Sequence, residues 1–339
     1  MTTTDYTTSA GAMSVGAHLV SPYAAGLFHK VIMESNPLLS LLNTRSSATV
    51  NANAVTTYVN CTINDIHCMK KVSVETILIA QTAAISFNLQ NIITNSQPWT
   101  PLVEVEGYIP VQPLYALESG LLEGIPVLAG TVKDEGLVFV YDIFKESINA
   151  TSYALILSTI FGAKNYVALS QYYPITSSID NNGVIDGRYA LGTIETDLTF
   201  YCPIKAIGLN NIPSYLYRFL HVSSFNNVTG VGGRNECFGK VCHGLELPYV
   251  FNNFNAGSNV HLNLTIEEKK LADYISNIWV NFISNGDPDI GLSIPAPFPR
   301  YNNYHDTILL LNEPVPTPPT DSHYRAVYCQ MWNSYVTTG

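Results

Sequence analysis

The stretch TTSAGAMS, residues 7–14, decides the fold that we expect for this chain. It matches the motif G-x-S-x-G except at the first position, where Thr7 replaces a glycine. In that motif a strand turns sharply into a helix, so the serine is exposed on a strained turn, and small neighbours let the two backbones pass closely. The pattern predicts Ser9 on a turn that leads into a helix. Alone it is weak support, because most short S-x-G sequences are ordinary turns.

Five further segments match a known family in their order along the chain. They are SPYAAGLFHKVIMES (21–35), PVLAGTVKDEG (126–136), VCHGLELPYVF (241–251), WVNFISNGDP (279–288) and CQMW (329–332). Together they resemble the type-B carboxylesterase and cholinesterase family over nearly the full chain. The resemblance implies an α/β class, the α/β-hydrolase fold with a central sheet and flanking helices. It also implies carboxylic ester hydrolysis through an acyl-enzyme.

The same resemblance implies a catalytic triad of Ser9, Glu135 and His243, in the chain order that this fold uses. Ser9 would be the nucleophile, and it needs a base within hydrogen-bond reach because a serine hydroxyl is weakly nucleophilic. His243 would be that base, since an imidazole accepts and returns a proton near neutral pH. Glu135 would hold the imidazole in the required tautomer and stabilise the imidazolium.

Structural interpretations of these residues stay open. Glu135 before Gly136 is also typical of a solvated turn. His243 lies among apolar neighbours, where a partly buried histidine with structural hydrogen bonds is common. His29, in the segment GLFH, resembles a structural position of the family, and we do not expect it to be catalytic.

The region before Ser9 departs from the family pattern. The resemblance implies several strands and a glycine-rich oxyanion loop upstream of the serine, and residues 1–8 do not have the apolar pattern of the strand that should feed the turn. Of the oxyanion donors, only the backbone N–H of Ala10 would remain, and losing one donor typically costs about 10²–10³ in rate. We therefore expect residues 1–339 to form a partial type-B carboxylesterase domain, with an N-terminally truncated sheet and an unpaired apolar edge.

Composition favours a secreted globular protein. Hydrophobic residues make up 47% of the chain, while charged residues make up only 12%, which leaves a surface rich in uncharged polar side chains. The net charge of −10 argues against nucleic acid or an anionic membrane as a partner. Glycosylation sequons occur at Asn60, Asn149, Asn227 and Asn263. Neither a membrane span nor a secretory signal peptide is recognisable, so we expect a secretory-pathway or extracellular location on the sequons and cysteines alone.

Six cysteines fit an oxidising compartment. The family resemblance implies the disulfides Cys61–Cys68 and Cys202–Cys329. Cys237 and Cys242 have three open interpretations: a local bridge beside His243, a zinc site that includes His243, or two buried thiols.

Hydrophobic periodicity and turn residues predict one domain without repeats. We expect helices at about 10–19, 73–84 and 266–284, and strands at about 30–34, 126–130, 214–221 and 307–311. Thr265 is the expected N-cap of the last helix, followed by two glutamates in its first turn, and Gly286 is expected to end it.

The sequence therefore predicts a serine esterase that acts on a small-molecule ester and needs neither a cofactor nor a metal. The alternatives are a catalytically silent relative with a structural or adhesive role, and a gene remnant without a stable product. Neither the substrate nor the oligomeric state follows from these residues.

Overall fold

The computed structural model of this chain describes residues 3–84, 98–103, 108–119, 124–177, 183–208, 212–225, 234–254, 262, 264–302, 304–315 and 320–338. The description below concerns these residues.

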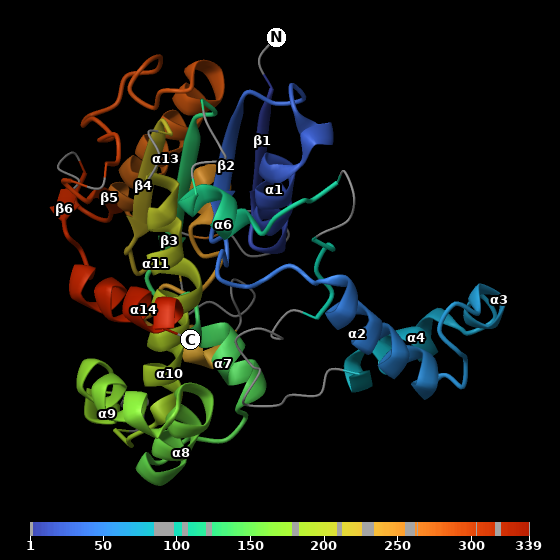
Figure 1. Ribbon diagram of the computed structural model, residues 1–339. Helices are drawn as coiled ribbons and strands as arrows, with labels where there is room; N and C mark the ends of the chain where they lie inside the picture. The colour runs from blue at the N-terminus through green and yellow to red at the C-terminus, as the bar shows by residue number, and fades with distance from the viewer. Residues whose placement is uncertain are drawn as a thin grey trace.

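A mostly parallel sheet of six strands forms the centre of the molecule (Figure 1). The strands are β1 (Thr4–Thr8), β2 (Lys30–Glu34), β3 (Val127–Val132), β4 (Ser214–Phe219), β5 (Thr307–Leu311) and β6 (Thr320–Ser322), and they lie in that order across the sheet. Neighbours from β1 to β5 are parallel, while β6 is antiparallel to β5. The carboxyl ends of β1 to β5 therefore meet at one edge, which is where open α/β sheets bind ligands.

Helices cover both faces of the sheet (Figure 1). The longer helices are α1 (Ala10–Val20), α2 (Arg45–Tyr58), α4 (Val74–Ala84), α8 (Ala150–Phe161), α9 (Ala163–Tyr172), α10 (Gly187–Glu195), α13 (Ile266–Asn285) and α14 (Ala326–Thr338). Shorter ones are α3 (Ile66–Met69), α6 (Pro113–Glu118), α7 (Leu137–Ile143), α11 (Cys202–Ile204), α12 (Leu247–Val250) and the π-helix η4 (Thr196–Tyr201), and single 3₁₀ turns are η1 (Pro22–Ala24), η3 (Ile175–Ser177), η5 (Lys205–Gly208) and η6 (Asn235–Cys237).

Alternate residues of each strand enter different cores, because successive side chains point to opposite faces of a sheet. In β2, Val31 and Met33 belong to a core with α1, α8 and α10, whereas Ile32 belongs to a core with α12 and α13. All five side chains of β2 are buried. Strands buried on both faces read as continuous apolar runs, as VIM does here.

The predicted elements are present, with their ends displaced by at most two residues. Thr265 caps α13 in a capping box with Glu268, and Gly286 ends the helix in the left-handed conformation. Most of the remaining helices, α8 to α10 among them, were not expected.

The expectation for residues 1–8 was wrong. Thr4–Thr8 form β1, paired in parallel with β2 and ending directly before Ser9. Threonine and tyrosine favour strands, and an edge strand with partly buried side chains does not need a continuous apolar sequence. The sequence of β1, TDYTT, also makes this edge more polar than the predicted apolar edge.

Candidate active site

Ser9 lies on the turn between β1 and α1, as the motif predicts. Its backbone has φ 56° and ψ −125°, and such a conformation costs a non-glycine residue about 1–3 kcal/mol. The N–H of Ser9 donates to the carbonyl of Glu34 at 2.9 Å, and its own carbonyl accepts from Met13 N–H at 3.0 Å, where α1 begins. The hydroxyl does not cap the helix. The turn therefore leaves the Ser9 side chain available for another partner.

Gly11 allows β1 and α1 to pass closely below Ser9. A Cβ atom on Gly11 would lie 2.0 Å from Oγ1 of Thr7 and 2.9 Å from its Cβ. The threonine that replaces the first glycine of the motif therefore fits only because the second glycine is kept.

Glu135 follows β3 at the same edge of the sheet and is fully buried. Its Oε1 accepts a hydrogen bond from Val132 N–H at 2.8 Å, and its Oε2 lies 2.5 Å from Nδ1 of His243. The solvated-turn interpretation of Glu135 is therefore wrong. With Nδ1 donating to Glu135, Nε2 of the neutral imidazole is the proton acceptor.

Contacts between two loops place His243 beside Glu135. Val241 N–H donates to Oδ2 of Asp134 at 2.9 Å, and Asp134 N–H donates to the Val241 carbonyl at 2.9 Å. A disulfide joins Cys237 to Cys242, the residue before His243. The buried-thiol and zinc interpretations of these cysteines are therefore wrong, because bridged sulfurs are neither thiols nor thiolate ligands.

The surroundings of His243 change its pKa in two directions. Burial lowers the pKa, but the charge of Glu135 and the hydrogen bond to it, with a lesser contribution from Glu246, raise it above its ordinary value overall. The imidazole is 15% exposed and contacts the rings of Phe139 and Phe200, with centroids 5.2 and 5.7 Å away. This environment stabilises the imidazolium that a general base must form.

The structure brings Glu135 and His243 into contact, and it places Ser9 at the same edge without a hydrogen bond between Ser9 and His243. Within the described part of the chain the Ser9 hydroxyl has no hydrogen-bond partner. The backbone N–H of Ala10 belongs to the first turn of α1, where a helix provides no internal acceptor. It is therefore available to an oxygen atom bound in front of Ser9.

Two buried glutamates behind the site were not predicted. Ser35 Oγ donates to Oε1 of Glu246 at 3.3 Å, and Trp279 Nε1 donates to Oε1 of Glu34 at 2.6 Å. Burial, and then the charge of Glu135, raise the pKa of Glu246 to about 7. Burial and the charge of Glu246 raise the pKa of Glu34 well above its ordinary value. Both residues lie in segments that carry the family resemblance, but sequence alone gives no sign that they meet.

The π-helix η4 packs against the loop that bears Glu135. Thr196 Oγ1 accepts a hydrogen bond from Gly136 N–H at 2.9 Å and donates to the carbonyl of Gly192 at 2.8 Å. The helix also places Phe200 against the His243 ring. π-Helical turns frequently occur at functional sites, and this one has no recognisable sequence signal.

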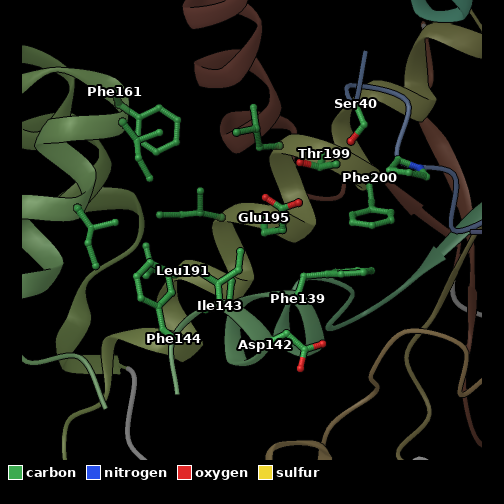
Figure 2. Close-up of a pocket in the computed structure, with 16 residues that line it drawn as sticks. Ser40, Phe139, Asp142, Ile143, Phe144, Phe161, Leu191, Glu195, Thr199 and Phe200 are labelled. Carbon is green, nitrogen blue, oxygen red and sulfur yellow. The ribbon is translucent and has the colours of Figure 1, made fainter. Parts of the chain in front are cut away.

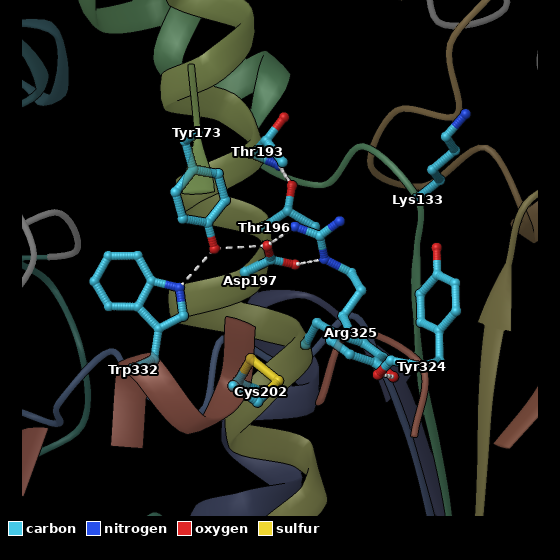
Figure 3. Close-up of polar contacts among 12 residues, drawn as sticks. Lys133, Tyr173, Thr193, Thr196, Asp197, Cys202, Tyr324, Arg325 and Trp332 are labelled. Atoms are coloured by element: carbon cyan, nitrogen blue, oxygen red, sulfur yellow. Dashed lines mark hydrogen bonds and ion pairs between the residues drawn. A yellow bond between two sulfur atoms is a disulfide. The ribbon is translucent and has the colours of Figure 1, made fainter. Parts of the chain in front are cut away.

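A buried polar network holds η4 in place (Figure 3). Asp197 is fully buried and pairs with Arg325, which precedes α14. Tyr173 donates to Asp197 at 2.8 Å and accepts from Trp332 Nε1 at 2.8 Å. The disulfide Cys202–Cys329 joins α11, which directly follows η4, to α14.

A cavity of about 260 Å³ is lined by Phe139 and Phe200 among others (Figure 2), and the same two rings contact the His243 ring. Its walls come mainly from α7, α8, α10 and η4. The apolar lining residues are Pro37, Phe139, Val140, Ile143, Phe144, Ile156, Ile160, Phe161, Leu191, Ile194, Leu198 and Phe200, and the polar ones are Ser40, Asp142, Glu195 and Thr199. The cavity therefore suits an apolar group bound against the two phenylalanine rings that contact His243.

One cluster among the described residues has potential metal ligands, namely His221, Glu268 and Glu313. Glu268 already accepts hydrogen bonds from the backbone N–H groups of Ser224 and Thr265, at 2.6 and 2.8 Å. His221 Nε2 lies 3.1 Å from Oε1 of Glu268. These hydrogen bonds account for Glu268, whereas the buried Oε1 of Glu313 lies 3.8 Å from Nε2 of His221 and has no hydrogen-bond partner among the described residues.

The structure has three disulfides, which include both pairs implied by the family resemblance, Cys61–Cys68 and Cys202–Cys329. Such bridges are typical of proteins from oxidising compartments. Among the sequons, Asn60 and Asn149 are exposed, whereas Asn227 and Asn263 lie outside the described residues. Within the described ranges, each helix is too short or too polar to traverse a bilayer.

Comparisons with known proteins agree with this architecture. Two solved structures, a PNB esterase and a thermophilic PNB esterase, superpose with TM-scores of 0.71 and 0.73 at 23% sequence identity. Each alignment covers 96% of this chain and 62% of the other. They show the α/β-hydrolase fold that the sequence predicts.

Among curated proteins, the cAMP-regulated D2 protein of Dictyostelium discoideum is 31% identical over 92% of this chain and 56% of its own length. The crystal protein of the same organism is 32% identical over 87% of this chain and 52% of its own length. The para-nitrobenzyl esterase of Bacillus subtilis is 26% identical over 91% of this chain and 58% of its own length. The chain thus spans about half the length of these relatives. A sequence model of the carboxylesterase family matches residues 4–332, and the chain belongs to this family.

Proposed function

We propose that the chain is the part of a serine esterase that carries the triad Ser9, Glu135 and His243, within one carboxylesterase domain over residues 1–339. The observation that supports this most is the hydrogen bond between the fully buried Glu135 and His243 Nδ1. It leaves Nε2 as an acceptor at the sheet edge where Ser9 stands on its strained turn. A general base with that partner is what a serine nucleophile requires.

In the proposed reaction, Ser9 Oγ attacks the ester carbonyl carbon while Nε2 of His243 takes the hydroxyl proton. The imidazolium then gives this proton to the leaving alkoxide, which departs as the alcohol and leaves an acyl group on Ser9. Water attacks the acyl carbon with His243 again as the base, and the carboxylic acid leaves. Ala10 N–H donates to the oxyanion during both attacks.

The proposed substrate class is supported by the cavity lined by Phe139 and Phe200, whose rings contact His243. Its mainly apolar lining fits the hydrocarbon part of a small ester. Several relatives carry esterase names, such as para-nitrobenzyl esterase and human cocaine esterase. Those names describe the relatives, and here they support only the reaction class.

The test is hydrolysis of p-nitrophenyl butyrate by the wild type and by Ser9→Ala and His243→Ala. We expect the two substitutions to lower kcat by a similar factor, on the order of 10⁴ or more, because members of a triad act as a unit. Activity that survives in Ser9→Ala would overturn the assignment of the nucleophile.

A silent relative is the second candidate. It is favoured by the missing hydrogen bond between Ser9 and His243 and by Thr7 in the first glycine position of the motif. In free enzymes, however, catalytic hydrogen bonds are often formed only with substrate bound. The same assay decides between the two candidates, since a silent relative gives no difference between the wild type and Ser9→Ala.

We also propose a secretory-pathway location with N-linked glycans at Asn60, Asn149, Asn227 and Asn263. Three disulfides support this proposal, as does the exposure of Asn60 and Asn149. Glycosidase treatment of the protein from its own cells should lower its mass by whole glycans. An unchanged mass would contradict glycosylation.

A further inference from the structure

Glu195 places a carboxyl group in the apolar cavity beside His243. It is the last residue of α10 and lies in the middle of the lining residues (Figure 2). Phe139 and Phe200 lie on one side of it, and Phe144 and Phe161 lie on the other. A carboxylate among aromatic side chains loses the hydration that it has in water.

Glu195 lies against the loop that carries the triad acid. A Cβ atom on Gly136, the residue after Glu135, would be 2.6 Å from the Cβ of Glu195. The cavity therefore touches the proposed catalytic residues at two points, at Gly136 through Glu195 and at the His243 ring through Phe139 and Phe200. In the proposal that follows, one small molecule extends from His243 past Phe139 and Phe200 to Glu195.

Glu195 has no ion-pair partner within the part of the chain that the structure describes. Among the described residues that line the cavity, none is Lys, Arg or His. Burial raises the pKa of Glu195, and a hydrogen bond with Thr199 opposes this only in part. Keeping Glu195 ionised in this cavity costs free energy, because the carboxylate is desolvated and unpaired. A ligand with a positive charge would remove this cost, whereas an uncharged ligand would increase it by excluding water.

Asp142 shows the contrast within the same cavity. It is the other acid of the lining, but Arg234 NH2 lies 2.5 Å from its Oδ1 and Lys145 Nζ lies 3.3 Å from the same atom. Hydrogen bonding to Arg234, against a smaller effect of burial, lowers the pKa of Asp142. Asp142 therefore has its counterions, and Glu195 does not.

We propose that Glu195 binds an ammonium group of the substrate, so that the preferred esters carry an amine on the part that enters the cavity. The faces of the phenylalanine rings add cation–π attraction to the ion pair. The chain's net charge of −10 attracts such a cation from solution. Glu195 is a specificity-determining residue in this proposal and takes no part in bond breaking.

Binding of cyclohexylammonium and of cyclohexanol to the full chain tests the proposal, measured by calorimetry at pH 7 in a Ser9→Ala background. The two ligands have nearly the same shape and differ in charge. We expect cyclohexylammonium to bind at least about tenfold more tightly, since unpaired buried charges are costly. Equal affinities, or tighter binding of the alcohol, would overturn the proposal without any variant of Glu195.

Glu195→Gln and Asp142→Asn provide the matched pair of variants. Glu195→Gln should remove the preference for the ammonium ligand without weakening the binding of cyclohexanol, because an uncharged ligand gains nothing from the carboxylate. Asp142→Asn should leave the preference in place, because its charge is already paired. Equal effects of the two substitutions would mean that Glu195 has no special role.

A kinetic experiment links the site to hydrolysis, and this part alone rests on the proposed function. Glu195→Gln should raise KM for an amine-bearing ester with little change in kcat, and it should lower kcat/KM for this ester far more than kcat/KM for p-nitrophenyl butyrate. An equal loss on both esters would contradict the proposal. If the wild type hydrolyses neither ester, the proposed function is contradicted, but the calorimetric result on ammonium binding still stands.

Discussion

Ser9 combines a strained backbone with a hydroxyl that the proposed reaction needs. Its φ of 56° strains the backbone of a serine but would not strain that of a glycine. Ser9→Gly should therefore raise the free energy of unfolding by about 1–2 kcal/mol relative to Ser9→Ala, as measured by urea denaturation. Equal stability of the two variants would mean that the turn stores no strain.

Glu135 controls the protonation of His243. It raises the pKa of His243, and the imidazole must be neutral to act as a base. Glu135→Gln removes the charge, so the pKa of His243 falls and the acidic limb of the kcat/KM profile should move to lower pH. We expect kcat to fall by about 10³–10⁴, the size of effect seen when a triad carboxylate becomes an amide.

Glu246→Gln is the control for this experiment. Glu246 contributes less to the pKa of His243 than Glu135 does. The profile should therefore move in the same direction by a smaller amount, and kcat should stay within about tenfold. A profile that does not move in Glu135→Gln would contradict the role of its charge.

At the scale of elements, α13 depends on its N-terminal cap. Glu268 closes the capping box with Thr265 and accepts further hydrogen bonds from Ser224. Burial alone would raise its pKa, but these hydrogen bonds lower it to about 2. A depressed pKa means that the ionised form stabilises the fold at neutral pH and that this contribution is lost as the pH falls through about 4 towards 2.

Glu268→Gln should thus lower the free energy of unfolding at pH 7 by about 1.5–3 kcal/mol, and the difference from wild type should shrink between pH 5 and pH 2. Glu267→Gln is the matched control, because Glu267 is exposed and pairs only with the exposed Lys270. If the loss in free energy of unfolding caused by Glu268→Gln does not change with pH, the ionised Glu268 cap is not the source of this stability.

The turn at Ser9 that leads into a helix and the N-cap of α13 at Thr265 could be predicted from the sequence, because neighbouring residues determine them. β1 was missed because an edge strand of threonines lacks an apolar pattern, and η4 because its π-helical turn depends on Asp197 and Arg325, which are far apart in the chain. The family resemblance predicted Glu135 and His243 as site residues. No pattern among neighbouring residues in the sequence predicted that Glu246, Phe200 and Glu195 lie close to them.

At the scale of the whole molecule, the Cys202–Cys329 bridge joins the start of α11 to α14 across 127 residues. Replacing both cysteines with alanine should lower the free energy of unfolding by about 4–5 kcal/mol in the chain-entropy model. Removing Cys61–Cys68 in the same way should cost only about 2–3 kcal/mol, because its sequence separation is 7 residues. Urea denaturation of the two variants measures both, and equal losses would contradict the dependence on loop length.

The most direct test of the proposed esterase is reaction of the full chain with a fluorophosphonate, followed by mass spectrometry of the peptide that contains Ser9. We expect one phosphonyl group on Ser9 in the wild type, none in Ser9→Ala, and a rate at least about 10³-fold lower in His243→Ala, because the probe requires a serine activated by its base. A wild type that remains unlabelled, or is labelled equally fast without His243, would contradict the assignment of Ser9, Glu135 and His243 as a working triad.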